Sequence, residues 1–264
     1  MHAPPLERYQ NVAAGIESAD QRLSRTQFEA FWREGWLGPL RCTDPTLVDV
    51  TTRVCEAGTP NSVDGRPVPP RETWHAAEVD KFNVANPHLD APAIHALAGH
   101  ASIVNPVAQL LGAAQVEFFQ SRYRVKLPGR PDVVPWHQDV GKTNGGLRDD
   151  GTPVQTLTVW LSLDGSLASA GALRVMPGTH ADLFGNWPEG YASKLSQQEI
   201  RELDTTLAIP LEAAPGEFFV FHSGLLHLTT PNVSREPRSA LALRYVAPED
   251  AIRRDITYTT VRAR

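Results

Sequence analysis

The residues of this chain whose types and spacing could do chemistry centre on a His-x-Asp motif, His137-Gln138-Asp139. The motif ends a run that is typical of a β-strand, and side chains alternate along a strand with a period of two, so the imidazole and the carboxylate share one face. A second imidazole from a distant strand, His222 or His227, would complete a set of two histidines and one carboxylate. Because such a set binds iron and leaves coordination positions open, the motif predicts an iron site.

A second His-x-Asp motif, His88-Leu89-Asp90, lies earlier in the chain. It is followed by Ala91-Pro92 and a helical pattern, which predicts that Asp90 is a helix N-cap with a proline in the first turn. We therefore interpret this second motif as structural.

Composition limits the classes of protein to consider. A chain of 264 residues with 41% hydrophobic content can bury a large core, and we expect a single domain over residues 1–264. The net charge of -5 gives no footprint for nucleic acid, and no apolar run is long enough to cross a membrane. Two cysteines and the absence of a secretory signal indicate a cytoplasmic protein. The expected partner is a small-molecule substrate, and the expected assembly is a monomer or a homodimer.

The elements that must position the motif fall into two parts. Residues 1–22 are expected to be a polar N-terminal extension, and residues 23–112 are expected to be mainly helical support. Three helices are expected there. The first begins at a capping box formed by Thr26 and Glu29, the second begins at Asp44-Pro45, and the third spans Ala91–Leu111.

Residues 113–248 contain seven or eight short strands separated by turns. Residues 181–207 are an insertion with a helix expected over Gln197–Leu203, capped by Ser196. Helices followed by many short strands predict a mainly β protein with flanking helices. The expected fold is a double-stranded β-helix, the cupin-like jelly roll, with the N-terminal helices packed on one sheet.

One predicted strand, over Val116–Lys126, carries an unusual row of side chains. Gln120, Arg122, Arg124 and Lys126 share one of its faces. Periodicity alone allows either a solvated sheet face or the lining of a polar cavity.

A series of further short motifs follows in order along the chain from Phe28 to Tyr245. They are Phe31–Leu37, Val107–Gly112, Gln120–Lys126, Trp136–Asp139, Gly171–Leu173, Met176–His180, His227, Pro231-Asn232 and Arg238. In order and spacing they resemble the iron(II)- and 2-oxoglutarate-dependent dioxygenases of the phytanoyl-CoA dioxygenase family, ectoine hydroxylase-like members included.

The resemblance implies roles for individual residues. His137, Asp139 and His227 would be the iron ligands, and Arg238, eleven residues after His227, would bind the distal carboxylate of 2-oxoglutarate. The other residues with implied roles are Thr229 and Arg124 for the co-substrate, and Gln120 and Trp160 for the lining of the substrate cavity. Arg122 is a further candidate for binding substrate, because its charge, with that of neighbouring polar and cationic residues, favours a small polar or anionic molecule. Alternation leaves Arg244 as an alternative to Arg238, because both fall on one strand face.

The activity implied by the resemblance uses iron(II), 2-oxoglutarate and O2. The expected reaction is hydroxylation of a small polar metabolite or a natural-product intermediate, with release of succinate and CO2. The alternative is a cupin-type metal protein, either an isomerase or a binding protein, that does not use 2-oxoglutarate and would not need Arg238.

Overall fold

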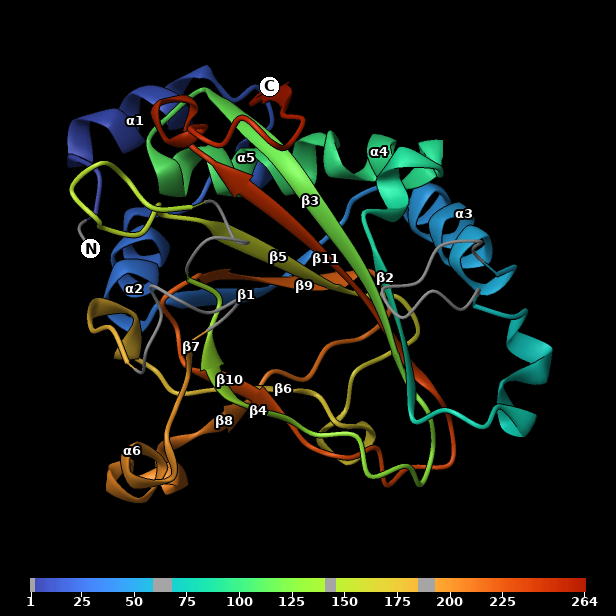
Figure 1. The fold of residues 1–264 in the computed structure, drawn as a ribbon. Helices are drawn as coiled ribbons and strands as arrows, with labels where there is room; N and C mark the ends of the chain where they lie inside the picture. The colour runs from blue at the N-terminus through green and yellow to red at the C-terminus, as the bar shows by residue number, and fades with distance from the viewer. Residues whose placement is uncertain (1–2, 59–67, 141–145, 185–192) are drawn as a thin grey trace.

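Two antiparallel sheets face each other in the computed structural model, which describes residues 3–58, 68–140, 146–184 and 193–264 (Figure 1). The larger sheet has the order β1 (Trp36–Arg41), β9 (Glu217–His222), β5 (Leu157–Ser162), β11 (Arg238–Val246), β3 (Gln115–Lys126) and β12 (Thr259–Arg262), and β2 (Lys81–Ala85) also pairs with β3. The smaller sheet has the order β7 (Ser193–Lys194), β4 (Val134–Gln138), β10 (His227–Thr229), β6 (Leu173–Val175) and β8 (Ile209–Pro210). This arrangement confirms the predicted double-stranded β-helix.

Helices cover the outer side of the larger sheet. In Figure 1 helices α1, α4 and α5 lie along this side, whereas α6 lies beside the smaller sheet. The helices are α1 (Leu6–Gly15), α2 (Arg25–Glu34), α3 (Pro45–Glu56), α4 (Pro92–Ala98), α5 (Ala101–Leu111) and α6 (Gln197–Glu202). Short 3₁₀ turns occur at Ala19–Gln21, Arg71–Ala76, Pro87–Leu89, Ala168–Ala170, Thr179–Ala181, Thr205–Leu207 and Pro248–Asp250.

Successive side chains of β11 point to opposite faces of the larger sheet and belong to two separate apolar clusters. Leu241, Leu243 and Tyr245 belong to the apolar cluster that the helices share with the larger sheet. Ala240 and Ala242 point to the opposite face, where the cluster also includes Trp160 and residues of the smaller sheet. Because the alanines carry only a methyl group, the space between the two sheets is left for longer side chains from neighbouring strands.

The N-terminal residues are more ordered than the sequence patterns predict. Within the expected polar extension 1–22, α1 forms a helix that buries Tyr9 and Val12 in the main apolar cluster. The helix has few apolar positions, so its amphipathic pattern in the sequence is weak. These positions are buried because α1 packs beside α5.

The capping box of α2 lies two residues earlier than predicted. Ser24 accepts a hydrogen bond from the backbone N–H of Gln27, and the Gln27 side chain accepts one from the backbone N–H of Ser24. The sequence contains two overlapping patterns of this kind, and the structure uses the first rather than Thr26 with Glu29. The caps predicted at Asp44 and Ser196 are confirmed.

The helix expected over Ala91–Leu111 is two helices. The helical conformation is interrupted at Gly99 and His100. The His100 side chain caps the start of α5 by accepting a hydrogen bond from the backbone N–H of Ser102. The N-cap of α4 is Ala91 rather than Asp90, which ends the preceding 3₁₀ turn. A capping imidazole and a glycine therefore interrupt a pattern whose apolar spacing is continuous.

No helix in the described ranges has both the length and the apolar character needed to cross a bilayer.

His222, at the end of β9, is fully buried and its pH behaviour provides a test of this fold. Its Nδ1 accepts a hydrogen bond of 2.9 Å from the backbone N–H of Gly224, while Nε2 has no partner among the described residues. Burial, with His180 nearby, lowers its pKa to about 3. The folded protein therefore keeps this imidazole neutral well below the pH at which the unfolded chain binds a proton.

We predict that His222 makes the metal-free protein less stable as the pH falls below about 6.5, because only the unfolded state takes up the proton. Between pH 7.5 and 5.0 this residue should remove about 2 kcal/mol of unfolding free energy. His222→Asn keeps an acceptor for the Gly224 N–H and should show a shallower pH dependence. Urea unfolding of both proteins at the two pH values measures the difference, and equal slopes would contradict the prediction.

Candidate metal centre

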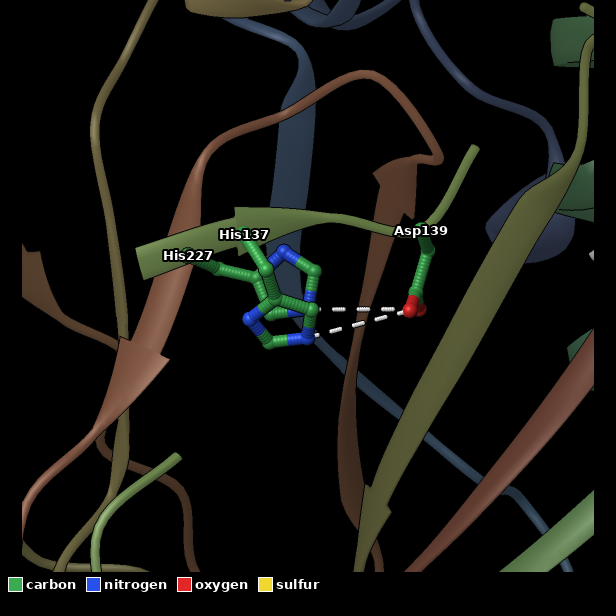
Figure 2. Close-up of side chains that lie close together, drawn as sticks. All are labelled: His137, Asp139 and His227. Atoms are coloured by element: carbon green, nitrogen blue, oxygen red, sulfur yellow. Dashed lines mark ion pairs between the residues drawn. The ribbon is translucent and has the colours of Figure 1, made fainter. Parts of the chain in front are cut away.

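Two histidines and one aspartate converge between the sheets (Figure 2). His137 of β4 is directly opposite His227 of β10 in the antiparallel pair, and their ring centres are 4.0 Å apart. Asp139 lies just beyond β4, with Oδ1 3.8 Å from Nε2 of His137 and Oδ2 3.9 Å from Nε2 of His227. One nitrogen or oxygen atom from each residue lies within 4.8 Å of the others, which is a spacing that a metal ion could bridge.

Backbone carbonyl groups orient both imidazoles. Nδ1 of His137 contacts the carbonyl oxygen of Pro135, and Nδ1 of His227 contacts that of Leu225, each at 2.8 Å. A carbonyl oxygen can only accept, so Nδ1 carries the proton in each ring and the lone pair of Nε2 is directed toward Asp139. This is the tautomer that a metal ligand needs, fixed by the strand on which each histidine lies.

The protonation states also suit a cation. Burial and the neighbouring His227 lower the pKa of His137 to about 3, and burial lowers the pKa of His227. Burial by itself would raise the pKa of Asp139, but Arg244 and the two imidazoles together hold it well below the usual range. The site therefore has neutral imidazoles and an ionised carboxylate near neutral pH, the forms in which these groups bind metals.

Arg244 of β11 holds the carboxylate in place. Its Nη2 donates a 2.7 Å hydrogen bond to Oδ2 of Asp139, and its Nη1 donates to Oε1 of Gln120 on β3. Oδ1 of Asp139 has no hydrogen-bond donor among the described residues. Arg244 is thus the partner of Asp139, and Gln120, which is expected to contact substrate, also accepts a hydrogen bond from Arg244.

Arg238, at the start of β11, has unsatisfied hydrogen-bonding capacity. It is 1% exposed, and Nη2 donates a 2.7 Å hydrogen bond to the carbonyl oxygen of Gly171, but Nε and Nη1 have no partner among the described residues. The hydroxyl of Thr229 is also buried without a partner and lines the same pocket. A buried guanidinium with free N–H groups beside a free hydroxyl fits a carboxylate ligand, because the planar fork can donate two parallel hydrogen bonds.

Gly171 allows its carbonyl to reach Arg238. The residue has a φ of +74°, and a Cβ there would lie 2.5 Å from the carbonyl oxygen of Thr230 and 2.9 Å from Cδ of Lys126. Any larger residue would displace the backbone that holds the guanidinium.

The polar face of β3 lines a cavity. Arg122, Arg124 and Trp160 border the pocket that contains the three candidate metal ligands, and Arg124 also borders the pocket of Arg238. Lys126, at the far end of this face, is buried and donates to Oδ2 of Asp132 at 2.8 Å. Of the two possibilities for this face, the structure therefore has the cavity lining.

Two other buried histidines, His88 and His222, lie apart from the candidate ligands. Nδ1 of His88 is 2.7 Å from the hydroxyl of Ser121, and burial is the main cause that lowers its pKa to about 4. His222 packs against the rings of Trp32 and His180. Both are neutral histidines buried among structural residues.

Sequence reasoning missed the role of Arg244. Arg238, Ala240, Ala242 and Arg244 alternate on one face of β11, which could have indicated that both arginines face the site. Its partners could not be inferred, because Gln120 is opposite Arg244 only through the register of β3 with β11.

The chain is similar to known proteins in both sequence and fold. A family model described as phytanoyl-CoA dioxygenase matches residues 31–240. Phytanoyl-CoA dioxygenase 1 of Oryza sativa subsp. japonica is 30% identical over 138 residues, which cover 49% of this chain and 44% of the rice protein. Phytanoyl-CoA dioxygenase of Arabidopsis thaliana is 26% identical over 148 residues, 56% of this chain and 50% of that protein. The matched segment thus spans half or less of these curated relatives.

Solved structures share the fold. The carbocyclase SnoK from nogalamycin biosynthesis, described as non-heme and alpha ketoglutarate dependent, aligns with a TM-score of 0.64 at 19% identity over 86% of this chain and 85% of SnoK. EctD from S. alaskensis with 2-oxoglutarate and 5-hydroxyectoine aligns with a TM-score of 0.62 at 20% identity, over 86% of this chain and 77% of EctD. At these identities the similarity shows a common fold.

We predict that His137→Ala and His227→Ala each abolish tight binding of a divalent metal, because two remaining ligands cannot hold the ion in place. His222→Ala is the matched control, since it removes a buried imidazole outside the site and should leave metal binding intact. Titration of each metal-free variant with Co(II), followed by its visible absorption, measures this. Loss of binding in His222→Ala with retention in His227→Ala would reverse the assignment.

Arg244→Leu should weaken metal binding about 10- to 100-fold, the usual cost of removing a group that orients a metal ligand. Arg244→Gln can still donate a hydrogen bond toward Asp139 and should lose less. The same Co(II) titration at pH 7.5 compares the two variants. An affinity equal to that of the unmodified protein in Arg244→Leu would show that Asp139 needs no such support.

Proposed function

The chain belongs to the phytanoyl-CoA dioxygenase family, and from that premise we propose that it is an iron(II)- and 2-oxoglutarate-dependent oxygenase that hydroxylates a small polar molecule. One observation carries the proposal. The buried candidate ligands His137, Asp139 and His227 lie in a pocket that shares residues with the pocket of Arg238, whose Nε and Nη1 have no hydrogen-bond partner among the described residues.

Each part of the site has a role in this proposal. His137, Asp139 and His227 would hold iron(II), while Arg238 and the Thr229 hydroxyl would bind the distal carboxylate of 2-oxoglutarate. Arg124 borders both pockets and would contact the same co-substrate between them. When bound, iron, 2-oxoglutarate and O2 together supply the oxidation of an unactivated C–H bond, with succinate and CO2 as co-products.

The protein contributes position and a dry environment. The two carbonyl contacts hold the imidazoles in one tautomer, and Arg244 holds Asp139, so the ligands need little rearrangement when metal binds. Trp160 and Phe221 are apolar walls of the same pocket, which would restrict water around the reacting carbon.

The alternative, a cupin-type isomerase or binding protein, leaves Arg238 unexplained. A buried guanidinium without a counter-ion is costly, and a metal protein that does not bind a dicarboxylate gains nothing from it. The unpaired N–H groups of Arg238 therefore favour use of 2-oxoglutarate.

We propose hydroxylation as the outcome of substrate oxidation. The structural relatives include a carbocyclase and an epimerase alongside EctD, so the same fold serves more than one outcome. Protein loaded with iron(II) and 2-oxoglutarate should consume O2 and release succinate when the right member of a metabolite panel is added. Mass spectrometry with ¹⁸O2 should then find one labelled oxygen in the product, whereas an unlabelled isomer would refute hydroxylation.

We predict that Arg238→Ala raises the concentration of 2-oxoglutarate required for half-maximal succinate release by roughly 30-fold to several thousand-fold. The physical reason is that removing one partner of a desolvated charge pair costs about 2–5 kcal/mol. Arg238→Lys keeps the charge without the planar fork, so its 2-oxoglutarate requirement should lie between those of the unmodified protein and Arg238→Ala. Co(II) binding should be unchanged in both variants. A 2-oxoglutarate requirement that did not change would transfer this role to another cation.

A further inference from the structure

The walls of the two pockets carry a large excess of positive charge. Among the described residues that line them are six lysines and arginines and only two carboxylates. The cations are Lys81, Arg122, Arg124, Lys126, Arg238 and Arg244, and the carboxylates are Asp132 and Asp139.

Both carboxylates are already bound by other members of this set. Asp132 lies 2.6 Å from Nζ of Lys81 and 2.8 Å from Nζ of Lys126. Asp139 is bound by Arg244 at 2.7 Å and is a candidate metal ligand. Three arginines, Arg122, Arg124 and Arg238, are therefore left without a carboxylate partner among the described residues.

The proposed co-substrate accounts for two of these three. 2-Oxoglutarate has two carboxylates, one for Arg238 and one within reach of the wall that contains Arg124. Arg122 is then the one arginine of this lining that has neither an ion pair among the described residues nor a carboxylate of the co-substrate.

Arg122 is placed to receive a ligand. It lies on β3 opposite Ala242 of β11 and Ala85 of β2, so no large side chain covers it from either neighbouring strand. It borders the pocket that also contains His137, Asp139 and His227, and it makes no hydrogen bond or ion pair within the described ranges. Burial, together with Arg244 and Arg124, lowers its pKa to about 10, so the guanidinium stays protonated at neutral pH.

We propose that the substrate carries an oxyanion group, a carboxylate, sulfate or phosphate, and that Arg122 binds this group inside the metal-site pocket. The inference rests on the proposed function for treating this pocket as the substrate site. It narrows the substrate class from small polar molecules to small acids.

The geometry also limits the shape of such an acid. A planar guanidinium can hold an oxyanion through two parallel hydrogen bonds and so fix both its position and its orientation. Because Arg122 and the candidate metal ligands border one pocket, the reacting carbon lies only a short distance from the anionic group. Trp160 and Phe221 in the same lining contact the apolar part of the molecule.

Equilibrium binding tests this inference without any turnover. Protein is loaded with Mn(II) and N-oxalylglycine, an unreactive analogue of 2-oxoglutarate, so that the candidate metal site and Arg238 are occupied. Calorimetric titrations at constant ionic strength then use benzoate with its amide benzamide, acetate with acetamide, inorganic sulfate and inorganic phosphate. We expect at least one anion to bind, and an acid to bind at least tenfold more tightly than its amide; the anion that binds best identifies the acid class.

Arg122→Gln should weaken binding of that anion about 10- to 100-fold and leave any binding of the amides unchanged, as expected for loss of a charged hydrogen-bond donor. Arg201→Gln removes an equal charge from the exposed surface of α6 and is the matched control, with binding expected to be unchanged. Mn(II) titration shows whether Arg122→Gln retains an intact metal site.

Equal anion binding by Arg122→Gln and the unmodified protein would overturn the inference, as would amides that bind as tightly as their acids. The two proposals fail separately. Succinate release driven by a substrate without an acidic group would refute the role of Arg122 and leave the oxygenase intact. Anion binding that depends on Arg122 in a protein that never converts 2-oxoglutarate would refute the oxygenase alone.

Discussion

The buried ion pair between Asp139 and Arg244 is the interaction on which the rest of the site depends. Asp139 follows β4 of the smaller sheet, and Arg244 belongs to β11 of the larger one, so the pair connects the two sheets across the interior. An ionised carboxylate in such a place is costly unless it is paired and hydrogen-bonded. Arg244 meets that need, and Gln120 in turn fixes Arg244 from β3. The distance between the sheets is thereby tied to the orientation of a metal-ligand candidate.

The same interior holds other charges that the protein alone does not neutralise. Within the part of the chain that the structure describes, Nε and Nη1 of Arg238 and the buried hydroxyls of Thr158 and Thr229 have no hydrogen-bond partner. Unsatisfied buried groups of this kind are uncommon in folded proteins and tend to mark places where a ligand completes the hydrogen bonding. The folded chain thus bears an electrostatic cost in its interior that bound anions and a metal would relieve.

Apolar packing elsewhere makes this cost tolerable. The outward face of the larger sheet, covered by α1, α4 and α5, forms the main apolar cluster, and β11 contributes Leu241, Leu243 and Tyr245 to it. The inward face of the same strand carries alanines and arginines. Alternation with a period of two therefore lets one strand stabilise the fold on one side and bind ligands on the other.

The sequence by itself determined the local features. The caps at Asp44 and Ser196, the long strand with its polar face, and the His-x-Asp motif depend on neighbouring residues, and the order of the motifs indicated the family and its fold. Even local signals were ambiguous where two patterns overlapped, as at Ser24 and Thr26. Only the tertiary structure decided that His227 rather than His222 lies opposite His137, that Arg244 binds Asp139, and that the arginines of β3 line a cavity. Periodicity shows which side chains share a face, but the register between strands distant in sequence depends on the packing of the whole protein.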